Sequence, residues 1–351
     1  MWREAARNFG AGASYGVISL VTFLAIALCL GIVATRGVVG VVTEASAFRE
    51  SGASVFRLDS PGNVDGNACD ALARVDGVDA AGATRAGDTL RFALLPDRPT
   101  PYFDASLGMA HLLDVDPASP NAGLIVDSTL AASLGLSHIP GTTFLIDGSR
   151  PSAVAGTYDH PDDGRDSTLS GAAIGLAVGS EPFDSCWVRF WPPSDNPLEL
   201  LGTVTIDVGG SNGATQWNPT LGRTLDPNAV FHSLPLVVLT SLAAIAAAAL
   251  AFVGLRLRRL ELASALHVGV SHSALAGISL AECAIWLIPA SLFAATTLAF
   301  CAAWHNPDPP LAAWLAGARV VAAAMSAWIL TIGLTAAMTN EAHLVRYFQQ
   351  R

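Results

Sequence analysis

Lysine is absent from this 351-residue chain, whose 19 basic residues are all arginine. A phosphate-binding loop of the pattern G-x-x-x-x-G-K-[ST] needs a lysine, so the chain cannot carry one. Charged residues are also scarce, at 14%, whereas ordinary soluble domains contain about 25%. Together with an apolar content of 52% and a mean hydropathy of +0.46, this scarcity predicts a membrane protein. If nucleotide drives it, another subunit must bind that nucleotide.

Four apolar segments are long enough to cross a bilayer, which takes about 20 residues. They are expected near Ser14–Thr35, Leu234–Leu255, Ala274–Trp304 and Leu315–Met338. The first two are separated by about 200 residues of acidic, loop-rich sequence, which is enough for a folded domain. The sequence therefore predicts a membrane α-helical protein with four transmembrane helices and an extracytoplasmic α+β domain inserted between helices 1 and 2.

This organisation has three parts. Residues 1–50 contain the N-terminal tail, the first span and an outward stalk, because no proline interrupts the chain before Gly52. Residues 51–231 form the extracytoplasmic domain. Residues 232–351 contain the other three spans, a connecting segment at 256–273 and the C-terminal tail.

The first span has an alternative interpretation as a cleaved signal peptide, since Arg3 and Arg7 precede it. Its apolar run is longer than a typical signal sequence, and no small-x-small cleavage site follows it. Cys29 is not a lipoprotein cysteine, because Leu28 occupies the preceding position where a small residue is needed. A retained anchor is the favoured interpretation.

The distribution of arginine predicts the orientation. Seven arginines lie at the termini and after the second span: Arg3, Arg7, Arg256, Arg258, Arg259, Arg346 and Arg351. The other short loop, "HNPDPP" after Trp304, has no basic residue. By the positive-inside rule both termini are cytoplasmic and the inserted domain lies outside the plasma membrane. Aromatic belts agree, with Trp304 and Trp314 outside and Trp2 and Tyr347 inside.

The inserted domain carries the negative charge of the chain. Residues 36–231 contain 24 acidic residues against 11 arginines. This balance argues against nucleic acid or anionic lipid as partners and favours cationic ones, although a solvated acidic surface explains it equally simply. The domain also contains Cys69 and Cys186, which predict a disulfide in an oxidising compartment. Two buried free thiols are the alternative.

Short strands mixed with short helices predict the α+β class. The stretch "GLIVDSTLAASLGL" reads as a strand running into a helix with Asp127 or Ser128 as its N-cap. "SPGN", from Ser60 to Asn63, reads as a turn, and "GTVTIDV", from Gly202 to Val208, as the last strand.

Two motifs suggest chemistry that their context does not favour. "GASYG", from Gly12 to Gly16, matches a G-x-S-x-G nucleophile elbow, but it opens a membrane helix where that motif needs a preceding strand. "DHPDDGRD", from Asp159 to Asp166, could bind a divalent cation, yet it lacks the spacing of a calcium loop. We expect a solvated loop there, with no metal, cofactor or catalytic residue in the chain.

Two ionisable residues lie inside predicted spans. Arg319, near the outer end of the fourth span, either extends to the interface or pairs with a partner helix. Glu282 lies about two turns into the third span, where an ionisable group usually faces a partner or a cavity. Pairing with the arginine cluster and a dynamic role are both open for Glu282.

The stretch around that cluster resembles the signature of the FtsX-like permease family, the membrane subunits of macrolide-exporter-type (type VII) ABC transporters. Its pattern R-R-x-E-[IL]-A is matched by Arg258, Arg259, Glu261, Leu262 and Ala263. A small-residue turn is matched by Gly269 and Ser271, and Glu282 follows at the family's distance. The likeness extends to "LIVDSTLAASLGL" and to the four-span topology. Leu266 and His267 depart from the family, which usually has Arg or Lys and then Ala.

The resemblance implies that residues 256–273 form a cytoplasmic coupling helix, in which Arg258, Arg259, Glu261, Gly269 and Ser271 dock on an ATPase subunit. In this family two permease subunits, as a homodimer or with a homologue, bind an ATPase dimer that holds ATP and Mg. ATP-driven motion is relayed to the outer domains by mechanotransmission. The implied function is efflux or extraction of a hydrophobic or peptidic substrate, such as an antibiotic, lipopeptide or lipoprotein. The composition further indicates a bacterium with a GC-rich genome.

A signalling permease that activates an extracytoplasmic cell-wall hydrolase, without transport, is the alternative. Cell-division members of the family have smaller outer domains, so about 200 residues between the spans favours the exporter. A membrane-anchored receptor without an ATPase would leave the match at Arg258–Ser271 unexplained.

Overall fold

The computed structural model describes residues 7, 15–116, 123–146, 151–177, 181–192, 197–207 and 213–338. The serine of the "GASYG" pattern, Ser14, lies outside these residues, as do Arg3, Arg346 and Arg351 of the predicted cytoplasmic arginines. The chain divides into two compact units, one of Met1–Glu44 with Asn228–Arg351 and one of Ala45–Pro227.

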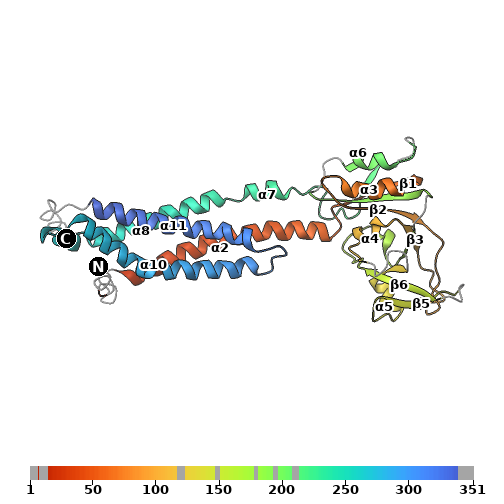
Figure 1. Cartoon of the computed structure of the whole chain (residues 1–351), viewed down its shortest axis with the longest axis horizontal. Coiled ribbons are helices and arrows are strands. Elements are labelled where there is room, and N and C mark those ends of the chain that lie inside the picture. Colours follow the sequence, from red (N-terminus) through yellow and green to blue (C-terminus); the bar gives the residue numbers. More distant parts are fainter. Residues whose placement is uncertain are drawn as a thin grey trace. The chain divides into compact units, whose positions relative to one another are not determined.

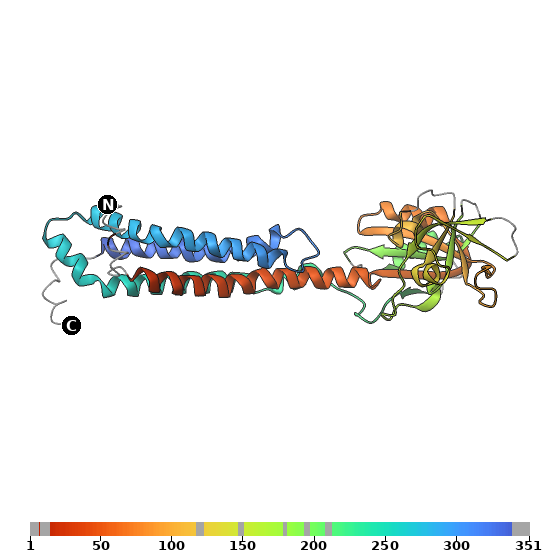
Figure 2. The same ribbon diagram turned by 90° about the horizontal axis from the view of Figure 1, so that it is seen from below.

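The first unit is a bundle of long apolar helices (Figure 1). In the described part of the chain, four helices are long and apolar enough, by length and composition, to cross a membrane. These are α2 (Gly16–Glu50), α8 (Leu236–Leu257, preceded by the short α7, Pro227–Ser233), α10 (His272–Ala303) and α11 (Leu311–Ala337). Both views show them side by side (Figures 1 and 2). Each of the four predicted spans therefore coincides with a helix that could cross a membrane, and α2 continues without a break to Glu50, as predicted for the stalk.

Small residues let the bundle helices approach closely. On α8, Ala243, Ala247 and Ala251 are buried at a spacing of four, which places them on one face of the helix. Where α2 meets α11, a Cβ atom on Gly317 would lie 2.2 Å from Thr35 Oγ1 and 3.0 Å from the Gly31 carbonyl oxygen. Such contacts favour association in lipid, where apolar burial alone gives little driving force.

Aromatic rings fill the bundle interior near the start of α2. Phe23 packs edge-on against Trp286 and Trp328, with ring centroids 5.9 and 6.0 Å away. The two tryptophans are 5.1 Å apart and also edge-to-face. This cluster joins α2, α10 and α11 in one core.

Arg36 of α2 caps another bundle helix, a contact that the sequence did not predict. Its guanidinium donates to the Trp304 carbonyl oxygen at 2.8 Å and to that of Cys301 at 3.4 Å. A cation at a helix C-terminus satisfies free carbonyl groups and complements the helix dipole. Arg36 therefore joins the first span to the end of the third.

The second unit is built on a mixed sheet of nine strands among the described residues, in the order β5-β6-β4-β7-β3-β2-β8-β1-β9. The strands are β1 (Val55–Val64), β2 (Val78–Ala86), β3 (Tyr102–Ala105), β4 (Leu124–Asp127), β5 (Gly141–Phe144), β6 (Pro151–Tyr158), β7 (Ala173–Leu176), β8 (Phe183–Phe190) and β9 (Ala214–Gln216). The helices are α3 (Gly66–Ala71), α4 (Gly108–Leu112), α5 (Ser128–Ser133) and α6 (Pro197–Leu201). The pairs β3–β7 and β4–β6 are parallel and the other strand pairs are antiparallel, so the sheet is mixed and is accompanied by short helices, in line with the predicted combination of strands and helices.

Local signals predicted part of this unit correctly. Asp127 ends β4 and caps α5, and its carboxylate accepts from the Thr129 backbone N–H at 2.7 Å. The predicted disulfide is also present, between Cys69 on α3 and Cys186 on β8, with Cα atoms 6.0 Å apart. It ties an early helix to a late strand, and both cysteines are buried.

Two predictions for this unit were wrong. Ser60–Asn63 is part of β1, where the register against β8 shifts and Asp184 accepts a hydrogen bond from the Gly62 backbone N–H at 2.9 Å. Gly202–Val204 is a short 3₁₀ helix, and Thr205 makes only an isolated bridge to Val64. The last described strand is β9.

Candidate functional site

The turn between α8 and α10 contains the residues that the family resemblance singles out. Helix α8 ends at Leu257, and Arg258 separates it from α9, which runs from Arg259 to His267. Arg258 has a non-helical backbone, with φ −95° and ψ 6°, so the chain changes direction there. Four residues then lead to α10, which begins at His272.

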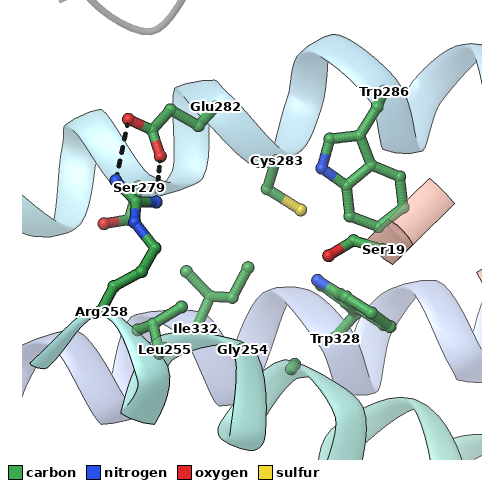
Figure 3. Close-up of a pocket in the computed structure, with 11 residues that line it drawn as sticks. Ser19, Gly254, Leu255, Arg258, Ser279, Glu282, Cys283, Trp286, Trp328 and Ile332 are labelled. Atoms are coloured by element: carbon green, nitrogen blue, oxygen red, sulfur yellow. Dashed lines mark hydrogen bonds and ion pairs between the residues drawn. The ribbon is translucent and has the colours of Figure 1, made fainter. Parts of the chain in front are cut away.

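Arg258 is the centre of an ion-pair cluster. Its Nη1 lies 2.5 Å from Glu282 Oε2 on α10 (Figure 3). Its Nε and Nη2 donate to the two carboxylate oxygens of Glu261 on α9, at 3.1 and 3.0 Å. One guanidinium group therefore joins two helices that are adjacent in the sequence through a turn.

The three charges differ in their exposure. The side chains of Arg258 and Glu282 are 9% and 5% exposed, whereas that of Glu261 is 49% exposed. Burial disfavours the charged form of Arg258, but its hydrogen bonds to Glu261 and Glu282 outweigh burial and raise its pKa above the usual value. Arg258 is thus a fixed positive charge between a buried carboxylate and a carboxylate that solvent can reach.

Helix α9 has two faces, as its spacing predicted. Leu262 and Leu266 are buried in the core of the bundle, and Ala265 packs against that core. Glu261 and Ser264 are exposed on the other side. Leu266 is therefore part of the core, while His267 is exposed.

Gly269 and Ser271 shape the turn into α10. Gly269 has φ +98°, a left-handed conformation that residues with a Cβ atom rarely adopt. The Ser271 side chain accepts a hydrogen bond from the Ala274 backbone N–H at 3.2 Å and so caps α10. These two residues set where and in which direction the third span begins.

Replacing Gly269 with valine is expected to impair assembly of the bundle. A Cβ atom there would meet nothing within 4 Å, so the cost is purely conformational, about 1–3 kcal/mol. Gly269→Ala should have a smaller effect of the same sign. Gly333→Ala is the matched control, because Gly333 also faces open space but lies within helix α11. Size-exclusion chromatography and thermal unfolding in detergent would measure the folded fraction; a wild-type result for Gly269→Val contradicts this role.

A small cavity lies beside the ion pair. It has a volume of about 40 Å³ and is lined by α2, α8, α10 and α11. Glu282, Cys283 and Trp286 project toward it from α10, and Trp328 and Ile332 lie on the opposite side (Figure 3). A cavity of that size holds about two or three water molecules. Its lining is mixed, with Arg258, Ser279 and Ser19 among apolar side chains.

The other predicted site residues are not part of this cluster. Arg319 is exposed on α11, eight residues after its first residue, and the described residues offer it no ion-pair partner. In the acidic loop, Asp163 and Asp166 pair with Arg165 and Arg57. Among the described residues, no group of three or more His, Cys, Asp or Glu side chains could hold a metal ion.

The chain is similar to the periplasmic region of MacB. That MacB region, from Actinobacillus actinomycetemcomitans, aligns with a TM-score of 0.32 and 10% identity over 50% of this chain and 94% of its own. A domain of a protein from Porphyromonas gingivalis assigned as a permease aligns with a TM-score of 0.31 and 14% identity, over 49% of this chain and 91% of its own. No protein-family model matches the chain, and no curated protein matches its sequence.

Proposed function

We propose that this chain is the membrane subunit of an ABC transporter of the FtsX-like permease type. In this proposal an ATPase dimer docks at the turn between α8 and α10, on the cytoplasmic side, and its ATP-driven motion reaches the outer domain through the bundle. The substrate is a hydrophobic or peptidic molecule of the outer leaflet or its surroundings. The ATPase holds ATP and Mg and hydrolyses the ATP, whereas this chain transmits the resulting motion.

The observation that carries the proposal is the double link made by Arg258. A displacement of α9 acts on Glu261 and Arg258, and the ion pair with Glu282 passes it into the third span. A buried ion pair is costly to break, because separation leaves a charge without a partner in a low-dielectric interior. The pair is therefore suited to keep α9 and α10 moving together.

The exposed side of α9 is suited to bind a protein partner. It presents the Glu261 carboxylate and the Ser264 hydroxyl, and at its end Val268 is 85% exposed. An exposed apolar residue with polar groups beside it matches the apolar centre and polar rim of a typical interface. The opposite side of α9 is anchored in the bundle core, so a load on the exposed face would not detach the helix.

Helix α2 supplies a connection toward the outer domain. It runs without interruption from Gly16 to Glu50, contributing Phe23, Ala27 and Ala34 to the bundle core and its last residues to the second unit. A continuous helix keeps all its intrahelical hydrogen bonds and transmits displacement better than a loop would. This supports relay through the first span.

Charge reversal of Glu261 tests the proposal. With the ATPase subunit encoded beside this gene, Glu261→Arg is expected to weaken association and ATPase stimulation about tenfold or more, because a rim carboxylate becomes a repelling cation. Co-purification and hydrolysis rates measure this, and the purified chain alone should show no ATPase activity. Glu181→Arg is the matched control, since Glu181 is also an exposed glutamate paired to an arginine, Arg85 at 2.6 Å.

Normal association and stimulation with Glu261→Arg would show that α9 is not the docking element. Hydrolysis by the isolated chain, free of contaminating ATPase, would contradict the division of labour between subunits. A cell-wall hydrolase that co-purifies through the outer domain would favour the signalling role over export.

A further inference from the structure

The acidic segment Asp159–Asp166 lies at the end of α2, within the second unit. Arg165 Nη2 donates to the carbonyl oxygen of Glu50, the last residue of the helix, at 2.6 Å. Asn218 Nδ2 donates to the carbonyl oxygen of the next residue, Ser51, at 3.0 Å. Two side chains from two separate loops thus bind consecutive carbonyl groups where the helix ends.

Arg165 is held in place for this contact. Its guanidinium group pairs with Asp163 at 3.1 Å and lies over the ring of Trp217, 5.0 Å from the centroid. The side chain is only 11% exposed. A fixed cation at the C-terminus of a helix complements the negative end of the helix dipole and satisfies a carbonyl group that has no intrahelical partner.

Asn218 is completely buried and uses both ends of its amide. Its Nδ2 reaches Ser51 and also the Asp163 carbonyl oxygen at 3.3 Å. Its Oδ1 accepts from the Thr220 hydroxyl at 2.6 Å and from the Thr220 backbone N–H at 3.1 Å. A buried amide with these partners is restricted to one orientation, since flipping it would lose them.

Close packing restricts the backbone around these contacts. Gly52, with φ +76°, turns the chain out of α2, and a Cβ atom on it would lie 2.8 Å from the Trp217 ring. Gly164, with φ +97°, lies between Asp163 and Arg165, and a Cβ atom there would lie 2.3 Å from Thr220 Cγ2. Both turns require glycine for conformation and for space.

The same residues contact the first strand of the sheet. The backbone N–H of Trp217 donates to the Val55 carbonyl oxygen at 2.9 Å, at the start of β1. The Asp166 carboxylate pairs with Arg57 of β1 at 3.2 Å; burial disfavours its charge, but bonds from Thr168 and the Arg57 cation outweigh this and lower its pKa. Only Ser51–Ser54 separate α2 from β1 along the chain.

We propose that Arg165 and Asn218 are positioning residues that clamp the end of α2 to strand β1, so that movement of the first span enters the sheet directly. The movement itself rests on the proposed function, whereas the clamp does not. The acidic segment therefore serves to hold Arg165 and Arg57 rather than a cation. A second contact at the helix end, Arg49 with Asp79 at 2.6 Å, is 44% and 31% exposed and contributes little by comparison.

Hydrogen exchange on the full chain in lipid nanodiscs tests the clamp. In Arg165→Gln, amides of the peptide from Phe48 to Val55 are expected to exchange about tenfold faster or more, since a buried hydrogen bond to a charged group is lost. Exchange in β8 should change by less than about twofold. Arg49→Gln is the matched control, with an expected local change below about twofold. Arg165→Lys retains the charge and one donor, so its exchange rate at Phe48–Val55 should lie between those of the wild type and Arg165→Gln.

Two outcomes would overturn the clamp. One is unchanged exchange at Phe48–Val55 in Arg165→Gln. The other is an equal increase in β8, which would make Arg165 a general stabiliser of the domain. If Arg165→Gln does not fold, the comparison of Arg165→Lys with Arg49→Gln decides, because the clamp requires the larger local effect from Arg165→Lys.

A second arm uses the complex with the ATPase subunit. In the wild type, ATP is expected to change the rate of amide exchange in β1. In Arg165→Gln this change should be less than about half as large, while the ATPase still associates normally. If ATP changes exchange in β1 equally in both proteins, the movement does not reach the sheet through the clamp. If the wild type binds no ATPase, the proposed function fails, and the exchange measurements on the chain alone still decide the clamp.

Discussion

Replacement of Glu282 with alanine should destabilise the membrane bundle by about 3 kcal/mol, because it removes one partner of a buried ion pair. The side chain of Glu282 is 5% exposed and that of Arg258 is 9% exposed, so the guanidinium group loses a partner in a largely buried position. Glu261 remains bonded to Arg258, which places the effect at the lower end of the range for such pairs. Denaturant unfolding in detergent, followed by the fluorescence of Trp286 and Trp328, would measure the change.

Two variants distinguish this cost from a general effect of mutation. Glu261→Ala should cost less than about 1 kcal/mol, since its side chain is 49% exposed. The double variant Arg258→Met with Glu282→Met should recover most of the stability, because it leaves no buried charge without a partner, and Glu261 is exposed to solvent. Equal losses for Glu282→Ala and Glu261→Ala would be incompatible with the assigned roles. The double methionine variant removes the ion pair between Arg258 and Glu282 without destabilising the bundle. It should therefore show whether this ion pair is needed for the chain to stimulate the ATPase.

Removing the disulfide should cost the outer domain about 4–5 kcal/mol of free energy of unfolding in the chain-entropy model. Cys69 and Cys186 are 117 residues apart, so the bond closes a long loop in the unfolded chain. That loss is a large share of the stability of a domain, which is about 5–15 kcal/mol. In calorimetry of the full chain, the variant Cys69→Ala with Cys186→Ala should therefore unfold at a much lower temperature than the wild type.

The matched control for the disulfide is Cys301→Ala, which removes a free and partly buried cysteine of α10. It should leave unfolding of the outer domain unchanged. Non-reducing mass spectrometry should recover Cys69 and Cys186 in one cross-linked peptide pair. Recovery of both as free thiols, from protein kept oxidised throughout, would disprove the bond.

Features set by short stretches of chain could be predicted from the sequence. The four spans follow from continuous apolar runs, and Asp127 is recognisable as a cap because it lies between a β-branched run and a helical one. The failure at Ser60–Asn63 has a physical reason. Pro61 and Gly62 suggest a turn, but Asp184 on β8 supplies the acceptor that keeps the segment in the strand. That partner is 122 residues away in the sequence.

The same limit applies to the candidate site. The sequence located Arg258, Glu261 and Glu282, but it did not show that one guanidinium group binds both carboxylates. That arrangement depends on the left-handed turn at Gly269, which returns the chain so that α10 passes Arg258. Arg36 was missed because its partners are carbonyl groups of α10, which carry no side-chain signal. The order of the nine strands depends on long-range pairing throughout.

The close crossing of α2 and α11 has a mechanical consequence. At Gly31 and Gly317 the two backbones are so near that neither helix can shift toward the other, while the rest of α2 extends on both sides. With a rise of 1.5 Å per residue, the arms from Gly31 to Gly16 and from Gly31 to Glu50 are about 22 and 28 Å long. Tilting about this fulcrum would move the Glu50 end about 1.3 times as far as the Gly16 end, and in the opposite direction. A side chain added at Gly317 would push α2 and α11 apart at this contact. Even Gly317→Ala should therefore change how far the ends of α2 move when the helix tilts.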